Sequence, residues 1–141
     1  GIHAVKIKGA WSNSTVTTNY VKKMSVGTAN QSRLLAGVSS ATAFPPPTQA
    51  SLSSGGQIVN FSVSSKAANA FSATEIVAQF IGSISVGDVT PGNGGTLFGI
   101  AAEGIRKISG VDSSGKFSEK NLTDNPAGTP ITDQDFVVAL V

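Results

Sequence analysis

The sequence lacks cysteine altogether and has few charged side chains. Its 141 residues include no Cys and one His, which excludes a disulfide framework, a thiolate zinc site and a paired-histidine metal site. Charged residues make up 13% of the chain, against about 25% in ordinary soluble domains. The hydrophobic share of 40% is too high for a disordered chain. We interpret this composition as that of a folded chain whose weakly charged surface is suited to contact with other protein.

Recognisable catalytic motifs are also missing. No Gly-x-Ser-x-Gly elbow occurs among the many serines, and the carboxylates are scattered without calcium-loop spacing. Residues 110–116 imitate a phosphate-binding loop, but Phe117 stands where that loop needs Ser or Thr, so a β-turn is predicted there. The lone histidine, His3, is interpreted as a strand residue near the terminus. We predict that the protein is not an enzyme and has no catalytic, cofactor-binding or metal site.

Long hydrophobic runs are absent as well. Apolar runs such as 76–81 and 136–141 fall far short of the roughly 20 residues that span a bilayer, so no membrane partner is expected. Gly1 is compatible with removal of an initiator Met, with cleavage of a leader and with a tag remnant, and the rest of the sequence does not decide among them.

Charge is distributed unevenly along the chain. Six basic residues precede the first acidic residue, Glu75, and carboxylates outnumber basic residues after it. Complementary charge of this kind favours head-to-tail or arm-to-body pairing of subunits, although the two halves could instead neutralise each other within one monomer. Nucleic acid is a less favoured partner, because the basic charges are dispersed and only Trp11 and Tyr20 lie near them as stacking aromatics.

Alternating apolar and polar residues indicate strands at 3–8, 15–24 and 57–65. The first two could pair as a hairpin across Ser12-Asn13-Ser14, and in the third Val59, Phe61 and Val63 are expected to face the core. The predicted fold is mainly β: one β-sandwich or barrel-like domain over 1–141, with extended arms and at most one or two short helices.

Two segments fit both helix and strand. Residues 72–89 have a capping-box pattern but also alternate, and we favour strand. In 97–108 the apolar residues recur with helical spacing, which predicts a helix, while Gly99 and Gly104 leave a glycine-broken strand as the alternative.

The remaining segments are expected to be irregular or to lie at sheet edges. Residues 27–56 are predicted as a long loop or arm, because Pro45, Pro46 and Pro47 cannot donate hydrogen bonds inside a sheet. Residues 116–122 are expected to form an exposed edge strand. Residues 136–141 are apolar on both faces and predict a closing strand, which completes its own sheet or inserts into a neighbour's.

Two stretches resemble parts of tailed-phage capsid decoration (cement) proteins: Gly99-Ile-Ala-Ala-Glu-Gly-Ile105, and the closing strand 136–141. The resemblance implies a non-enzymatic structural subunit in a virion, arranged as trimers or similar homo-oligomeric clusters on a shell. A main coat protein of the virion is a variant of the same predicted function. The resemblance also implies a basic N-terminal arm that reaches onto a neighbour. The assembly contacts that we predict are His3, Lys6, Lys8, Phe136, Val138 and Leu140.

Two other functions remain open from the sequence. The first is an extracellular pilus or fibre subunit at the cell surface, in which a terminal strand of one copy completes the sheet of the next. The second is a carbohydrate-binding β-sandwich module, for which Trp11, Tyr20 and a few Phe side chains would have to supply a stacking platform.

Overall fold

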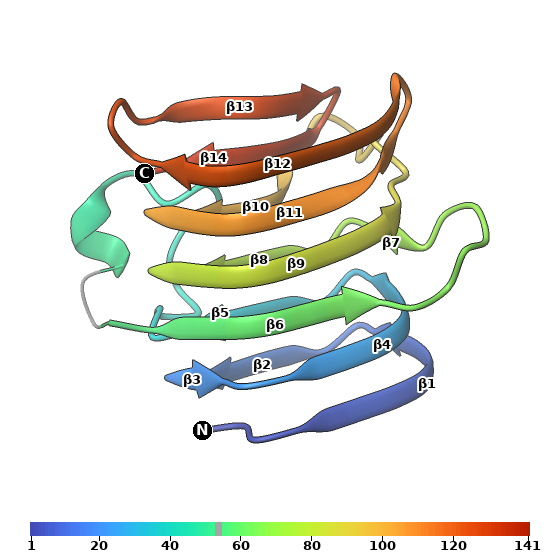
Figure 1. Cartoon of the computed structure of the whole chain (residues 1–141), viewed down its shortest axis with the longest axis horizontal. Coiled ribbons are helices and arrows are strands. Elements are labelled where there is room, and N and C mark those ends of the chain that lie inside the picture. The colour runs from blue at the N-terminus through green and yellow to red at the C-terminus, as the bar shows by residue number, and fades with distance from the viewer. Residues whose placement is uncertain (53–54) are drawn as a thin grey trace.

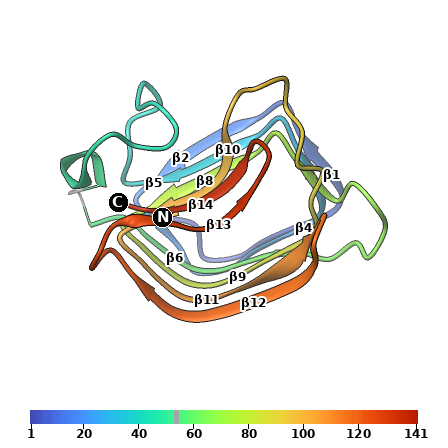
Figure 2. The ribbon, with the colours of Figure 1, turned by 90° about the horizontal axis from the view of Figure 1, so that it is seen from above.

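Two β-sheets packed face to face enclose one hydrophobic core (Figure 1, Figure 2). The structure is a computed structural model that describes residues 1–52 and 55–141. In these residues fourteen strands form a sheet of eight, sheet A, and a sheet of six, sheet B. Sheet A contains β1 (Val5–Ser12), β3 (Tyr20–Val21), β4 (Met24–Asn30), β6 (Gln57–Val63), β7 (Phe71–Ser72), β9 (Phe80–Asp88), β11 (Gly104–Asp112) and β12 (Gly115–Thr123). Sheet B contains β2 (Thr15–Thr18), β5 (Arg33–Ala36), β8 (Glu75–Ala78), β10 (Phe98–Ala102), β13 (Gly128–Asp133) and β14 (Phe136–Leu140). The predicted mainly-β fold class is confirmed.

The chain winds between the sheets as a solenoid. In sheet A, β1, β4, β6, β9 and β11 pair in that order, and in sheet B the order is β2, β5, β8, β10 and β14; all of these pairs are parallel. Each passage through sheet A and back through sheet B makes one coil. The coils stack from the blue N-terminal end to the red C-terminal end in Figure 1. The architecture is therefore a short parallel β-solenoid, in which each coil buries its apolar side chains against its neighbours.

The expected hairpin between the first two strands is wrong. β1 and β2 lie in different sheets, and each pairs with the next coil instead of with the other strand. Asn13, between them, has a φ of 51°, in the left-handed region, and turns the chain from sheet A into sheet B. Gln31 and Ala73 take the same conformation, with φ values of 48° and 46°, at the matching corners of the next two coils.

A column of hydroxyl groups lines this corner. Ser14, Ser32 and Thr74 follow the three left-handed residues, and Ser32 and Thr74 are fully buried. The Ser14 N–H donates to Ser32 Oγ at 3.3 Å, and the Ser32 N–H donates to Thr74 Oγ1 at 3.4 Å. The side chains thus partner backbone groups where the strand ladder is interrupted, which buried polar groups require.

Matching positions of successive coils stack in the core. In sheet B, Leu34, Ile76, Ile100 and Val138 lie in register on neighbouring strands, and all four are fully buried. Burying side chains of this size stabilises a fold by about 1.5–3 kcal/mol each. The closing strand 136–141 is confirmed as part of this core, between β10 and β13.

In β6 and β11 of sheet A, two successive inward-facing residues lie three positions apart. Ile58 and Phe61 are buried in β6, whereas Val59 and Asn60 are both half-buried on the outer side, so the expected inward position of Val59 is wrong. The same pattern recurs in β11, where Ile105 and Ile108 point inward. This spacing mimics a helical repeat, which explains why the helix predicted over 97–108 is wrong; β10 and β11 occupy that segment. The prediction of strand for 72–89 is confirmed by β8 and β9.

The long loop is shorter than expected and covers one sheet. Residues 27–30 belong to β4 and residues 33–36 to β5, so the irregular segment begins after Ala36; it contains a short 3-10 helix, η1 (Gln49–Leu52). Residues 53–54 of the predicted loop lie outside the described residues. Val38 and Leu52 of this segment pack on the outer side of sheet B with Leu35, Val77, Ala101 and Ala139. Arg33 also holds the segment, because its Nη1 donates to the carbonyl of Ser40 at 2.8 Å. The segment is thus a docked cover of sheet B.

Candidate interaction surfaces

The first coil leaves its outer strand edges unpaired among the described residues. β1 pairs with β4 alone, and β2 pairs with β5 alone. The N–H of Val5 donates to the carbonyl of Lys23, on the side of the next coil. Because successive residues of a strand point their backbone groups to opposite sides, the Lys6 N–H points away from the stack. Such an edge is a template for pairing with another strand.

The core is also incompletely covered at this end. Ile7 and Val16 face inward but are only half-buried, whereas their register partners in the next coil, Val26 and Leu34, are fully buried. Ile2 and Val5 are half-buried in the same way. We call the outer edges of β1 and β2, with these four apolar side chains, the open end.

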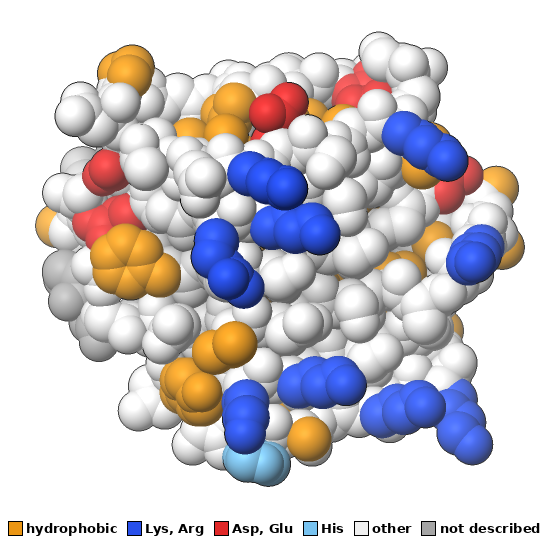
Figure 3. All heavy atoms as spheres, viewed as in Figure 1, with side chains coloured by type: hydrophobic (Ala, Val, Ile, Leu, Met, Phe, Trp, Pro, Cys, Tyr) orange, Lys and Arg blue, Asp and Glu red, His pale blue; other side chains and the backbone are white. Residues whose placement is uncertain are grey.

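Positive charge gathers around the open end. His3, Lys6, Lys8, Lys22 and Lys23 are exposed there, and no acidic residue precedes Glu75 in the sequence. Figure 3 shows Lys and Arg side chains along this end of the molecule, with no Asp or Glu among them on the face in view.

The opposite end of the stack finishes on antiparallel strands, and their outer edges are also unpaired among the described residues. β12 pairs antiparallel with β11, and β13 pairs antiparallel with β14, so each sheet ends on a strand of reversed direction. Ile131 of β13 is buried in the core, and Phe117 and Leu122 of β12 pack against the core but stay half-buried. We call the outer edges of β12 and β13 the capped end. From Gly115 onward the chain has four carboxylates and two lysines: Glu119, Asp124, Asp133 and Asp135 against Lys116 and Lys120.

The predicted assembly contacts divide into two groups. His3, Lys6 and Lys8 are exposed at the open end, as an interaction surface requires. Phe136, Val138 and Leu140 are buried in β14 and packed in the core, so they are unavailable to a neighbour, and we withdraw them as assembly contacts. The backbone edges of β1 and β2 were not predicted, because which strand ends a sheet depends on tertiary pairing.

The outer face of sheet A has a basic patch that was not predicted from the sequence. Arg106, Lys107 and Lys120 are exposed on β11 and β12, and Lys107 lies directly opposite Lys120 in the antiparallel register. The ion pair found among the described residues is elsewhere, between Arg33 Nε and Glu75 Oε1 at 3.3 Å. These three cations therefore have no carboxylate within salt-bridge distance in the described chain. We call them the basic patch; Figure 3 shows a group of Lys and Arg side chains on this face.

A row of serines crosses the sheet beside this patch, two residues along β11 and β12 from Lys107 and Lys120. Ser25, Ser62, Ser85, Ser109 and Ser118 occupy matching positions on five neighbouring strands, from β4 to β12. The first four are half-buried, and Ser118 is exposed. Because these side chains are short, the face that they form is flat and rich in hydroxyl groups. We call this set the serine row.

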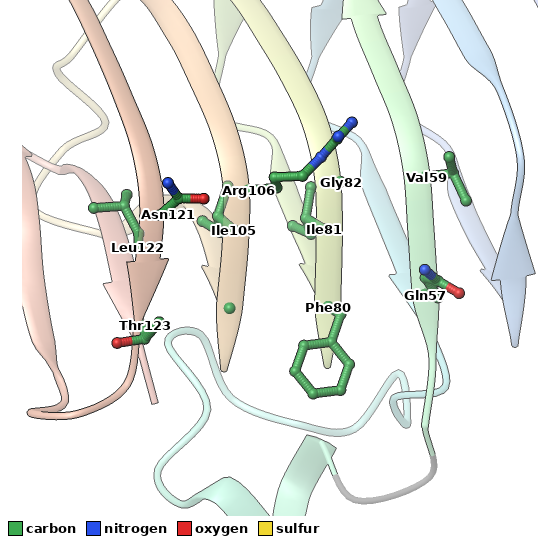
Figure 4. Close-up of a pocket in the computed structure, with 11 residues that line it drawn as sticks. Gln57, Val59, Phe80, Ile81, Gly82, Ile105, Arg106, Asn121, Leu122 and Thr123 are labelled. Atoms are coloured by element: carbon green, nitrogen blue, oxygen red, sulfur yellow. The ribbon is translucent and has the colours of Figure 1, made fainter.

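A shallow depression of about 510 Å³ adjoins the basic patch. Figure 4 shows Phe80 at one side of it, with Gln57, Arg106 and Asn121 around it. Phe80 is 50% exposed, which is unusual for a phenylalanine. The depression thus combines one aromatic ring, two amide groups and a guanidinium.

The aromatic platform expected for a sugar-binding module is only partly present. Trp11 is buried and packs on Phe61, with ring centroids 6.1 Å apart, so it is not available to a ligand. Tyr20 is 38% exposed and, like Phe80, is a register partner of Gln57. The two exposed aromatic residues, Tyr20 and Phe80, therefore lie on strands that are separated by the strand of Gln57.

Three further observations concern chemistry and membranes. The segment predicted as a β-turn is the tight connection of β11 and β12, in which Asp112 Oδ1 accepts the Ser114 N–H at 2.8 Å. Within the described residues, no three His, Cys, Asp or Glu side chains gather as a metal site would need. No helix in the described part of the chain is long and apolar enough to cross a bilayer.

Comparison with known proteins finds no matching family model, no similar curated protein and no similar solved structure.

Proposed function

We propose that this chain is a non-enzymatic structural subunit of a protein assembly, whose copies join end to end. The observation that carries the proposal is the open end. There, two strand edges lie unpaired and the inward apolar side chains are only half-buried, while the other end of the same stack finishes on two reversed strands whose outer edges are also unpaired among the described residues. Solenoids need a cover over each terminal coil, and a second copy can supply one.

Strand directions fit such a contact. All strands that lead from β1 to β11 run parallel, and β12 is reversed. A second copy placed along the stack axis would therefore set its β12 antiparallel to β1 and its β13 antiparallel to β2. The lengths are compatible, with eight residues in β1 and nine in β12, and with four in β2 and six in β13. Backbone hydrogen bonding could then continue from one copy to the next.

Charge supports the same orientation. The open end is surrounded by Lys6, Lys8, Lys22 and Lys23. At the capped end β12 carries Lys116 and Lys120 against Glu119, so the excess of carboxylates in this segment comes from Asp124, Asp133 and Asp135, at or near β13. Complementary potential favours the contact between unlike ends and disfavours the contact between two open ends. Because the two surfaces differ, the contact is heterologous, and repeating it produces a linear filament unless the rotation closes a ring.

This geometry favours the fibre-type assembly considered from the sequence over a closed trimer. The virus particle as the setting, including a capsid decoration role, stays a prediction that rests on the resemblance of 99–105 and 136–141. In a fibre and in a virus particle alike, the chain would serve as a non-enzymatic structural subunit.

The test is the molar mass in solution at increasing protein concentration, measured by light scattering, with electron microscopy of the largest species. We expect the mass to rise in steps of one subunit and filaments to form. Lys6→Pro should weaken association by about tenfold or more, because it removes an N–H that points out of the open end. The matched control Lys6→Gln removes the charge but keeps the N–H, and should weaken it less.

Circular dichroism and thermal unfolding of both variants show whether the monomer fold is kept. A chain that stays monomeric at every concentration and ionic strength would contradict the proposal. So would equal association of the Lys6→Pro and Lys6→Gln variants.

A further inference from the structure

We propose that the outer face of sheet A binds a linear polysaccharide that carries carboxylate groups. This proposal does not depend on end-to-end assembly: it shares β12 with the capped end, but it uses the exposed side chains of Ser118 and Lys120 and not the backbone edge of that strand. The binding surface consists of the depression beside Phe80, the basic patch and the serine row, which follow one another in this order along β11.

The first argument is the charge of the basic patch. Lys107 and Lys120 are directly opposite each other on paired strands, and like charges at such positions destabilise a sheet. Arg106 adds a third cation, and no carboxylate of the described chain lies within salt-bridge distance of these three. A bound anion would remove this repulsion, so the patch is better suited to a complex with an anionic ligand than to the free protein.

The second argument is the neighbourhood of Arg106. A guanidinium can bind a carboxylate through two parallel hydrogen bonds, which an ammonium cannot. Gln57 and Asn121 border the same depression and offer both donors and acceptors, while the Phe80 ring presents an apolar face (Figure 4). An aromatic face, amide groups and a cation around one shallow depression match a sugar ring that bears a carboxylate.

The third argument is the repeat of the serine row. Neighbouring strands lie about 4.8 Å apart, so the row presents hydroxyl groups at that interval along the stack. This interval is close to the length of one sugar residue in an extended polysaccharide. A chain that lies across the strands could therefore meet a hydroxyl group at each successive sugar.

Nucleic acid fits this surface less well. Single strands are held mainly by bases stacked on several aromatic side chains, whereas Trp11 is buried and the exposed rings, Tyr20 and Phe80, are separated by Gln57. In duplex DNA the phosphates of each strand repeat about every 3.4 Å along the axis, which does not match the interval of the row.

The experiment measures binding of alginate, a linear polymer of uronate sugars, by calorimetry or by retardation in affinity electrophoresis. Neutral dextran of similar length and poly(dT) serve as the comparison polymers. We expect alginate to bind, dextran not to bind, and poly(dT) to bind more weakly than alginate at equal salt. Affinity for alginate should fall as the salt concentration rises, because the contacts are exposed charges.

Four variants locate the site. Combined Arg106→Gln, Lys107→Gln and Lys120→Gln should lower the affinity by about tenfold or more, and Arg106→Lys alone should lower it measurably although the charge is kept. Phe80→Ala should also weaken binding, with the fold checked by circular dichroism. Lys66→Gln, in the exposed loop after β6, is a control that removes one charge away from the site and should have no effect.

The proposal is overturned if alginate does not bind, or if dextran or poly(dT) binds as tightly as alginate. It is also overturned if the triple variant binds alginate as well as the Lys66→Gln control does.

Discussion

The backbone N–H of Ser32 donates to the hydroxyl of Thr74 at 3.4 Å, although 42 residues separate them in the sequence. The two residues occupy the same corner of successive coils, each after a residue of left-handed conformation. Their contact connects the second coil to the third at the corner where the chain passes from sheet A into sheet B. The corner is therefore a place where the stacking of coils can be tested directly.

Ser32→Ala should lower the free energy of unfolding by about 1–3 kcal/mol, because the buried hydroxyl also donates to the Asn30 carbonyl at 3.0 Å and accepts from the Ser14 N–H. Urea denaturation measures the loss. The control is Ser14→Ala in the same column, where the hydroxyl is exposed and the change should stay within about 0.5 kcal/mol. Equal effects of the two substitutions would count against a structural role for the buried column.

Gly82→Ala should destabilise the fold by about 1–3 kcal/mol, because a Cβ at this position would meet the carbonyl oxygen of Val59 at 2.5 Å. The backbones of β6 and β9 approach closely there, and neither can move without disturbing the core. Thermal unfolding measures the change. Gly9→Ala, where a Cβ would have open space, is the control and should leave the melting temperature nearly unchanged.

Lys120→Glu should raise the free energy of unfolding by about 0.2–1 kcal/mol, because it places a carboxylate directly opposite Lys107 in place of a second ammonium. Urea denaturation at low salt measures the gain, which should shrink at high salt as the charges are screened. Lys66→Glu makes the same change of charge away from the patch. If that control stabilised the protein equally, the gain would come from net charge and not from the cross-strand pair.

Leu52→Ala should loosen the cover of sheet B and lower the free energy of unfolding by about 2–4 kcal/mol. Leu52 is fully buried against Leu35 and Val77, outside the main core. Limited proteolysis should cut within 37–56 faster in this variant than in the parent protein. Pro47→Ala, at an exposed position of the same segment, is the control. Unchanged proteolysis in Leu52→Ala would mean that other contacts hold the segment.

Local features of the fold could be predicted where a few neighbouring residues determine the conformation. The turn at 112–115 follows from Asp, Ser and Gly, and the strand over 116–122 was expected at a sheet edge because its lysines discourage further pairing. The exposed basic residues His3, Lys6 and Lys8 could also be identified from the sequence. The basic patch could not, because Lys107 and Lys120 become neighbours only through the pairing of β11 with β12.

The sequence by itself determined that this chain is mainly β, since composition and alternation act over a few residues at a time. Only the tertiary structure decided that the strands wind as a solenoid. Ser14 and Ser32 are 18 residues apart, but Ser32 and Thr74 are 42 apart, because an inserted segment lies between the second and third coils. An insertion outside the stack leaves the coil intact while it destroys the period in the sequence. Pairing between coils is a long-range contact, so the open end and the faces of the stack exist only once every coil has found its neighbour.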